Sequence, residues 1–523
     1  MYRLRLGFAL LAPVLWTSCS SSDDDTGGDP PPPPPAIVGA VFAMTNGEGQ
    51  PADNGDVAGP NAVVSYSRDE NGMLTFVGSY PTGDLGGDFD GGEGLDPLIS
   101  ANAVQLTPDN TRLLAVNAGS NTITSFLVED DMSLTMVSTE PTGGVGPNSI
   151  ATDGERVFVT NIDADGNFNG EPDQVGSVVS FTIDSEGNLS SIVSEQELEN
   201  RPSDVRLSSN GDFIVISSLT AGSLGLTGTV GMTPGDSLMD ENSDTDGPDE
   251  IVAHAVAVDG TISARAPLGS AISSFRDVRS NGLGFQGPDE MGVDPIGTPV
   301  GNYRNLPSPI GMLVFPANDA GFDIVVATET REFSAFGDPP TLPNLEAGSI
   351  STFLLNTTTG ELSNIVGGTD ISAHEAGEPN QLTFCWIDAV PAANGGVTAY
   401  VSNTINSLIS SFEIDGDGNA NVLDGIVAAG NGPFGPNEDN TTIVAGPGMT
   451  LGETVFGNTD GYIDMAISAD NDYLYQLTGL SGTIEVYRRN SDNSLTLIQS
   501  VDEEDANGEG ALPTQNTQGI IAF

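Results

Sequence analysis

The chain contains no lysine, and its 523 residues include only 14 arginines as strong bases. Against these stand 73 acidic residues, which gives a formal net charge of −59. A surface this negative repels nucleic-acid phosphates and anionic lipid headgroups, so it argues against nucleic-acid binding and electrostatic membrane attachment. It attracts cations, and two interpretations stay open: solvation in a salty medium, or calcium binding at particular loops.

Cysteine and histidine are also scarce, with two residues of each. Two cysteines exclude a disulfide framework, and no zinc-binding spacing, nucleotide-binding loop, nucleophile elbow or haem motif occurs. Cys385 lies inside the apolar run 382–387. This setting predicts a buried, unreactive thiol.

The N-terminal segment has the pattern of a bacterial export signal. Two arginines precede the apolar stretch 6–16, which is too short to span a bilayer. Residues 15–20, Leu-Trp-Thr-Ser-Cys-Ser, then resemble a lipobox, although that family prefers leucine where Trp16 stands. The resemblance implies that Cys19 carries lipid. An ordinary secretory leader is the alternative.

The domain boundaries follow from this pattern. We expect residues 1–19 to be a lipoprotein-type signal peptide and residues 20–36 to be an Asp- and Pro-rich tether, with six prolines at 30–35. The protein is then expected in the bacterial cell envelope, as an outer-membrane lipoprotein or a secreted protein. It would meet the membrane only through the lipid anchor.

A four-stranded unit recurs along the rest of the chain. Glycine is abundant, at 66 residues, which suits many short strands joined by tight turns. The clearest copies span 101–137, 148–193 and 381–427, and weaker ones begin near 37, 202, 309 and 462. Seven copies predict an all-β, seven-bladed β-propeller of four-stranded antiparallel blades over residues 37–523. The alternative architectures are a linear stack of repeats and a pair of sandwiches. We expect the apolar segment 519–523 to pair with the first blade and close the ring.

Two short segments carry a family resemblance. Residues 116–123, Val-Asn-Ala-Gly-Ser-Asn-Thr-Ile, and residues 400–403, Tyr-Val-Ser-Asn, resemble the Tyr-Val-Thr-Asn propeller repeat. The whole pattern, over 38–523, resembles the lactonase-type seven-bladed propellers, which include 6-phosphogluconolactonase and the carboxymuconate lactonizing enzymes. The resemblance implies the propeller fold and, more weakly, an activity on lactones.

The longest insertions are predicted to lie on one face of the propeller. With strands a to d counted outward from the centre, the a–b and c–d turns are tight, whereas b–c loops and d-to-a links are long. Because these long connections join strand ends on the same side, we expect the working surface there, around the central channel.

One acidic loop is the best candidate for a metal site. Oxygen-bearing residues alternate at Asp240, Asn242, Asp244 and Asp246, with Glu250 following. Calcium takes six to eight oxygen ligands, and alternate residues of a curling loop can present them to one point. The loop resembles the calcium loops of thrombospondin-type repeats, although a merely solvated acidic loop stays open as the alternative.

Candidates for catalysis are few. His374 lies in a d-to-a link with acidic neighbours, where it could act as a general base. Lactone-hydrolysing relatives act on anionic substrates, so Arg201 and Arg331, with Glu329 beside the latter, are the matching cationic candidates. None of the family's own catalytic residues can be carried over by alignment.

Two functions therefore stand side by side. The first is a surface-anchored monomeric binding or scaffold module whose loop-rich acidic face meets a protein or glycan, with Ca²⁺ as its one conceivable cofactor. The second is a lactonase-like hydrolase or cyclase acting on a small lactone. The missing cationic pocket favours the first, and the family resemblance favours the second.

Overall fold

The computed structural model describes fourteen stretches of the chain, namely residues 35–47, 57–89, 96–164, 176–198, 201–219, 250–265, 308–330, 349–365, 371–372, 384–404, 407–430, 461–501, 512–513 and 517–523. Contacts divide the chain into two units, Met1–Ala36 and Ile37–Phe523. The predicted leader with Cys19 and residues 20–34 of the predicted tether lie outside the described residues. No helix long and apolar enough to cross a membrane occurs in the described part of the chain.

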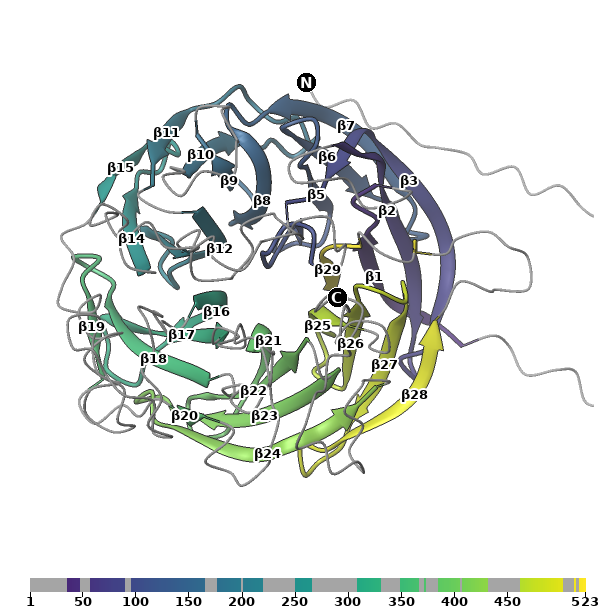
Figure 1. The fold of residues 1–523 in the computed structure, drawn as a ribbon, viewed down its shortest axis with the longest axis vertical. Helices are drawn as coiled ribbons and strands as arrows, with labels where there is room; N and C mark the ends of the chain where they lie inside the picture. The colour runs from purple at the N-terminus through teal and green to yellow at the C-terminus, as the bar shows by residue number, and fades with distance from the viewer. Residues whose placement is uncertain are drawn as a thin grey trace, which may run out of the picture. The chain divides into compact units, whose positions relative to one another are not determined.

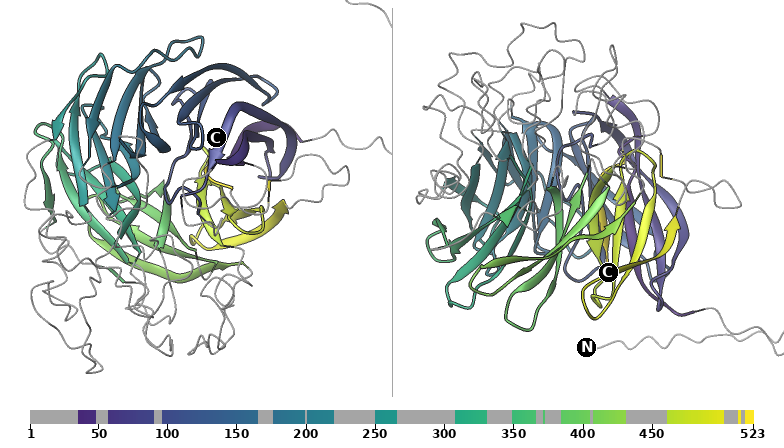
Figure 2. Two further views of the ribbon diagram at one scale, coloured as in Figure 1. Left: turned by 45° about the horizontal axis from the view of Figure 1, so that its top comes forward. Right: turned by 60° about the horizontal axis from the view of Figure 1, so that its bottom comes forward.

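Seven antiparallel sheets form a ring in the second unit (Figure 1). The four main strands of each sheet follow one another outward from the axis. The turned views show neighbouring sheets packed face to face (Figure 2). From the axis outward, blade 1 contains β29 (Ile520–Ala522), β1 (Ile37–Met44), β2 (Val57–Asp69) and β3 (Leu74–Gly87). Blade 2 contains β4 (Val104–Leu106), β5 (Arg112–Asn117), β6 (Thr122–Val128) and β7 (Leu134–Pro141). Blade 3 contains β8 (Val145–Thr152), β9 (Arg156–Asp163), β10 (Ser177–Thr182) and β11 (Ser194–Glu197).

The remaining four blades repeat this order. Blade 4 contains β12 (Arg201–Leu207), β13 (Phe213–Leu219), β14 (Glu250–Val256) and β15 (Ile262–Arg265). Blade 5 contains β16 (Ser308–Pro316), β17 (Phe322–Thr330), β18 (Ser349–Asn356) and β19 (Leu362–Asn364). In blade 5, β20 (Ile371–Ser372) also pairs with β18. Blade 6 contains β21 (Phe384–Pro391), β22 (Val397–Asn403), β23 (Leu408–Ile414) and β24 (Ala420–Ala429). Blade 7 contains β25 (Tyr462–Ile467), β26 (Tyr473–Thr478), β27 (Ile484–Arg489) and β28 (Leu495–Val501). The predicted fold class is therefore confirmed.

The last strand closes the ring, as the sequence predicted. β29 takes the innermost place of blade 1 by pairing with β1, with Phe42 opposite Ile521 and Ala43 opposite Ile520. The Phe42 and Phe523 rings stack with centroids 6.3 Å apart. Arg68, whose side chain is almost fully buried, donates from Nε to the Phe523 carbonyl oxygen and pairs through Nη1 with Asp470 of blade 7. Strands from the two ends of the propeller sequence thus share one sheet. An ion pair also joins blade 1 to blade 7.

Buried apolar side chains between neighbouring sheets form the core. Both faces of the inner and middle strands are covered: β5, β22 and β26 are buried at every position. This explains why their sequences lack the simple alternation of strands that face water on one side. Cys385 is among these buried residues, as predicted, and burial raises the pKa of its thiol well above the ordinary range.

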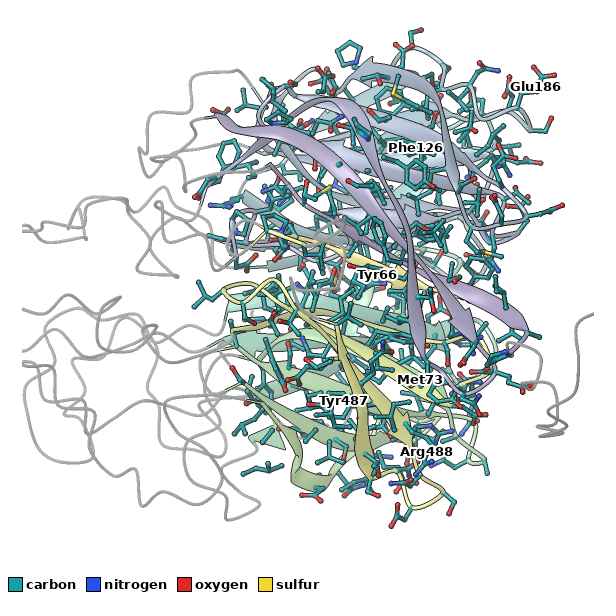
Figure 3. The ribbon with its side chains drawn as sticks, turned by 90° about the vertical axis from the view of Figure 1, so that its right-hand side faces the viewer. Tyr66, Met73, Phe126, Glu186, Tyr487 and Arg488 are labelled. Carbon is teal, nitrogen blue, oxygen red and sulfur yellow. The ribbon has the colours of Figure 1, made fainter. Side chains whose placement is uncertain are left out.

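The two faces of the ring differ in their connections. Tight c–d turns follow β2, β10 and β27, and the labelled residues Met73, Glu186 and Arg488 mark this side of the ring in Figure 3. The long connections join strand b to strand c of one blade or strand d to strand a of the next. Residues 164–176, 220–249 and 331–348 make b–c connections, and residues 266–307 and 430–461 make d-to-a connections. They all join strand ends on the opposite face, as predicted.

Candidate functional site at the axis of the ring

The predicted site residues fall mostly outside the described residues. His374, Arg331, Asp240, Asn242, Asp244 and Asp246 are not described, and for Glu329 and Glu250 only the backbone is placed, at the end of β17 and the start of β14. Among the described residues, no group of three or more histidine, cysteine or acidic side chains is arranged to hold a metal ion. The acidic calcium loop therefore stays a prediction.

Arg201 is the one predicted site residue whose side chain is described. It begins β12 and donates from Nη2 to the Leu98 carbonyl oxygen at 3.0 Å and from Nη1 to that of Phe89 at 3.3 Å. Both acceptors belong to the link between blades 1 and 2. Arg201 thus holds backbone in place at the long-connection end of the axis.

That link forms a plug, residues 98–102, across the long-connection end of the axis. The Ser100 carbonyl oxygen accepts from Trp386 Nε1 at 2.9 Å and from Gln518 Nε2 at 2.8 Å, and Ser100 Oγ donates to the Asn148 carbonyl oxygen. The Ala101 amide donates to the Ser203 carbonyl oxygen. These partners come from blades 3, 4 and 6 and from the segment leading into β29.

The plug also fills the axis with apolar side chains. Ile99 and Ala101 belong to one buried cluster with Ile310, Trp386 and Ile463, which come from the inner strands of blades 5, 6 and 7. Ile99 has a φ of 48°, a conformation that β-branched residues rarely adopt and that costs on the order of 1–3 kcal/mol. The surrounding hydrogen bonds and packing hold this strained residue in place.

The plug predicts a measurable cost for Trp386→Phe. The change keeps most of the buried ring but removes the indole donor to Ser100, so we expect a loss of about 1–3 kcal/mol in the free energy of unfolding. Urea unfolding of parent and variant measures it. An unchanged midpoint would mean that this contact does not fix the plug.

Exposure along the inner strands shows which end of the axis is accessible. Residues 202–205, 309–312, 384–387 and 462–466 are buried, whereas residues 206–207, 313–315, 388–389 and 467, later in the same strands, are partly exposed. Each inner strand runs from the long-connection face to the a–b turn face. In the described residues, solvent therefore reaches the axis from the turn side, opposite to the predicted working surface.

Charged side chains gather where the buried and the accessible parts of the axis meet. We call Asp204, Arg206, Asp388 and Asp464 the axis cluster; they come from the inner strands of blades 4, 6 and 7. Asp204 is fully buried, Asp464 is 6% exposed, and Asp388 and the Arg206 side chain are partly exposed. The Arg206 guanidinium forms an ion pair with Asp204, and its charge also acts to lower the pKa of Asp388 and of Asp464.

The three carboxyls also connect neighbouring inner strands. One oxygen of each accepts an amide N–H from the next blade, and these donors are Met312 to Asp204 at 2.8 Å, Ile467 to Asp388 at 2.8 Å, and Ile520 to Asp464 at 3.4 Å. Inner strands of different blades share no ladder, so these bonds satisfy amides that would otherwise face the axis unpaired.

Burial dominates the acidity of the axis cluster. It raises the pKa of Asp388 to about 6 and that of Asp464 to about 7, against the lowering effect of Arg206 and backbone donors. The pKa of Asp204 is also raised by burial, although Arg206 Nε lies 3.0 Å from its Oδ2. Two groups that change charge near neutral pH are therefore under the electrostatic influence of one guanidinium.

The raised pKa of Asp464 makes a stability prediction. A carboxyl whose pKa is higher in the folded than in the unfolded state stabilises the fold when the pH is below the unfolded-state pKa of about 4. This contribution is lost as the pH rises towards the folded-state pKa of about 7. Asp464→Asn removes this dependence, so we expect the variant to gain stability relative to the parent between pH 4.5 and pH 7.5. The gain is of the order of a few kcal/mol. Urea unfolding at both pH values tests it, and a constant difference would contradict it.

Sequence reasoning missed the axis cluster. The usable signal is an aspartate within an otherwise apolar inner strand, as in residues 384–391, Phe-Cys-Trp-Ile-Asp-Ala-Val-Pro, and residues 462–467, Tyr-Ile-Asp-Met-Ala-Ile. An ionisable residue in a strand that must be buried is either paired or functional.

Comparison with known proteins agrees with this architecture. A family model described as lactonase, 7-bladed beta-propeller, matches residues 60–167, from β2 to the connection after β9. The chain resembles the lactonase-type seven-bladed propellers. No curated protein matches it.

Solved structures show similarity at the level of the fold. A selenium-binding protein from Sulfolobus tokodaii, named as hypothetical, is 10% identical with a TM-score of 0.50, covering 93% of this chain and 94% of that one. The Pseudomonas aeruginosa periplasmic gluconolactonase is 13% identical with a TM-score of 0.44, covering 91% of this chain and 98% of that one. At such identities the lactonase-type resemblance concerns architecture.

Proposed function

We propose that the protein hydrolyses a lactone at the axis cluster. The observation that carries the proposal is Asp388, a partly exposed residue of the axis whose carboxyl has a pKa raised to about 6 and is within the electrostatic influence of the partly exposed Arg206. A base with a pKa near the working pH combines ionisation with proton affinity, which is what general-base catalysis requires. The lactonase-type resemblance over residues 60–167 supports the same chemistry.

Each residue has a defined role in this reaction. Asp388, as the carboxylate, accepts a proton from a water molecule while the water oxygen attacks the lactone carbonyl carbon. Within the described part of the chain, only Nε of Arg206 has a hydrogen-bond partner, so its terminal nitrogens can donate to the carbonyl oxygen as negative charge develops there. The ring C–O bond then breaks, and the leaving oxygen takes the proton back from Asp388.

Asp204 and Asp464 position this pair. Asp204 Oδ2 fixes Arg206 through Nε, and its Oδ1 accepts from Asn102, the last residue of the plug, at 2.6 Å. Asp464 ties blade 7 to β29 and keeps a further carboxyl near the guanidinium. The charge and direction of Arg206 therefore depend on groups from several blades.

A panel assay tests the proposal. The full chain is incubated with five- and six-membered lactones, and acid release is followed by pH-stat against spontaneous hydrolysis. We expect catalysed opening of at least one lactone in the parent and none above the blank in the Arg206→Gln, Asp388→Asn double variant. If the folded parent opens no lactone, the proposal fails, and the binding-module alternative gains.

A further inference from the structure

The inner strands carry an unusual balance of charge. Their only charged residues are Arg201, Asp204, Arg206, Asp388 and Asp464. Arg201 donates to two backbone carbonyls at the plugged end, so Arg206 is left as the one guanidinium whose charge acts on the three carboxyls. Above about pH 7, where Asp388 and Asp464 are ionised, these two carboxylates outweigh the single guanidinium, and the axis cluster has a net negative charge whether or not Asp204 is ionised.

Within the described part of the chain, the axis cluster offers few of the groups that usually bind a phosphate or carboxylate. Such anions are held by several arginines or lysines, or by helix N-termini. The chain has no lysine, the described residues contain no helix, and the inner strands offer one accessible guanidinium, Arg206, whose Nε is held by Asp204 and whose terminal nitrogens alone can reach a ligand. The net charge of −59 adds a long-range repulsion of anions.

We infer that the substrate is an uncharged, hydroxyl-rich lactone, and that the axis cluster discriminates against phosphorylated or carboxylated lactones. This inference rests on the proposed function. Carboxylates are acceptor-only groups when ionised, so Asp388 and its neighbours suit the O–H donors of a sugar ring. The partly exposed Gln105, held by Asn102, adds a neutral polar group from blade 2.

The same charge assists release of the product. Hydrolysis adds one water across the ring ester bond and gives a hydroxy acid, which ionises to a carboxylate and a proton at neutral pH. The substrate therefore enters without charge and leaves as an anion, which the carboxyls around Arg206 repel. Product inhibition is expected to be weak and to strengthen at high salt, where this repulsion is screened.

A matched pair of substrates tests the inference. The full chain is assayed by pH-stat at about pH 8, where Asp388 and Asp464 are both ionised, with glucono-1,5-lactone and with 6-phosphoglucono-1,5-lactone, each against its uncatalysed rate. We expect kcat/KM to favour the uncharged lactone by about tenfold or more. Raising ionic strength from about 0.01 M to about 0.2 M should lift only the value for the phosphorylated lactone, because the Debye length falls.

Two variants sharpen the test. Asp464→Asn removes one carboxyl from the axis cluster and should reduce the preference for the uncharged lactone, whereas Asp424→Asn on the outer strand β24 should leave it unchanged. An equal or greater kcat/KM for the phosphorylated lactone would overturn the inference and leave the proposed function standing. Opening of neither lactone, nor of any other in the panel, would overturn both.

Discussion

Deleting residues 519–523 is expected to open the ring and cost about 5 kcal/mol or more in the free energy of unfolding. The deletion removes the innermost strand of blade 1, with the buried Ile520 and the backbone bonds between β29 and β1. It also takes away the Phe523 carbonyl that accepts from Arg68. Urea unfolding followed by tryptophan fluorescence measures the loss.

Point variants separate closure from ordinary packing. Ile520→Ala should cost about 2–5 kcal/mol because its side chain is 3% exposed, whereas Leu497→Ala on the outer strand β28, 49% exposed, should change stability by less than about 0.5 kcal/mol. Equal urea midpoints for the deletion and the parent would show that β29 does not hold the ring closed.

Asp388→Asn is expected to lower kcat for lactone opening by about 10²–10⁴-fold. The amide keeps the size of the side chain and can still accept the Ile467 N–H, but it cannot take a proton from water. Asp424→Asn, an exposed carboxyl-to-amide change in the same blade, is the control and should keep the parent's rate. Activity retained in Asp388→Asn, with the control unchanged, would remove Asp388 from the mechanism.

The repeat, the closure and the face of the long connections could be predicted because each depends on local pattern. Strand spacing recurs from copy to copy, and the apolar segment after Gly519 had one unpaired place to fill. The copy predicted over residues 101–137 is blade 2, whose inner strand β4 spans Val104–Leu106.

The axis cluster could not be predicted in the same way. Asp204, Asp388 and Asp464 come together only because blades 4, 6 and 7 face a common axis. Their pKa values depend on burial there, which the strand pattern alone does not give. The plug was missed because residues 98–102 follow no strand periodicity, and their contacts come from segments up to 418 residues away.

The pH dependence of lactone opening tests the central proposal most directly. For the full chain, kcat/KM on an uncharged lactone should rise with pH, with a midpoint near 6, and level off above it, because Asp388 must be ionised to accept the proton. In Asp388→Asn the rise should disappear along with the activity. A profile without this rise in the parent, or the same rise in the variant, would contradict the assignment of Asp388 as the base.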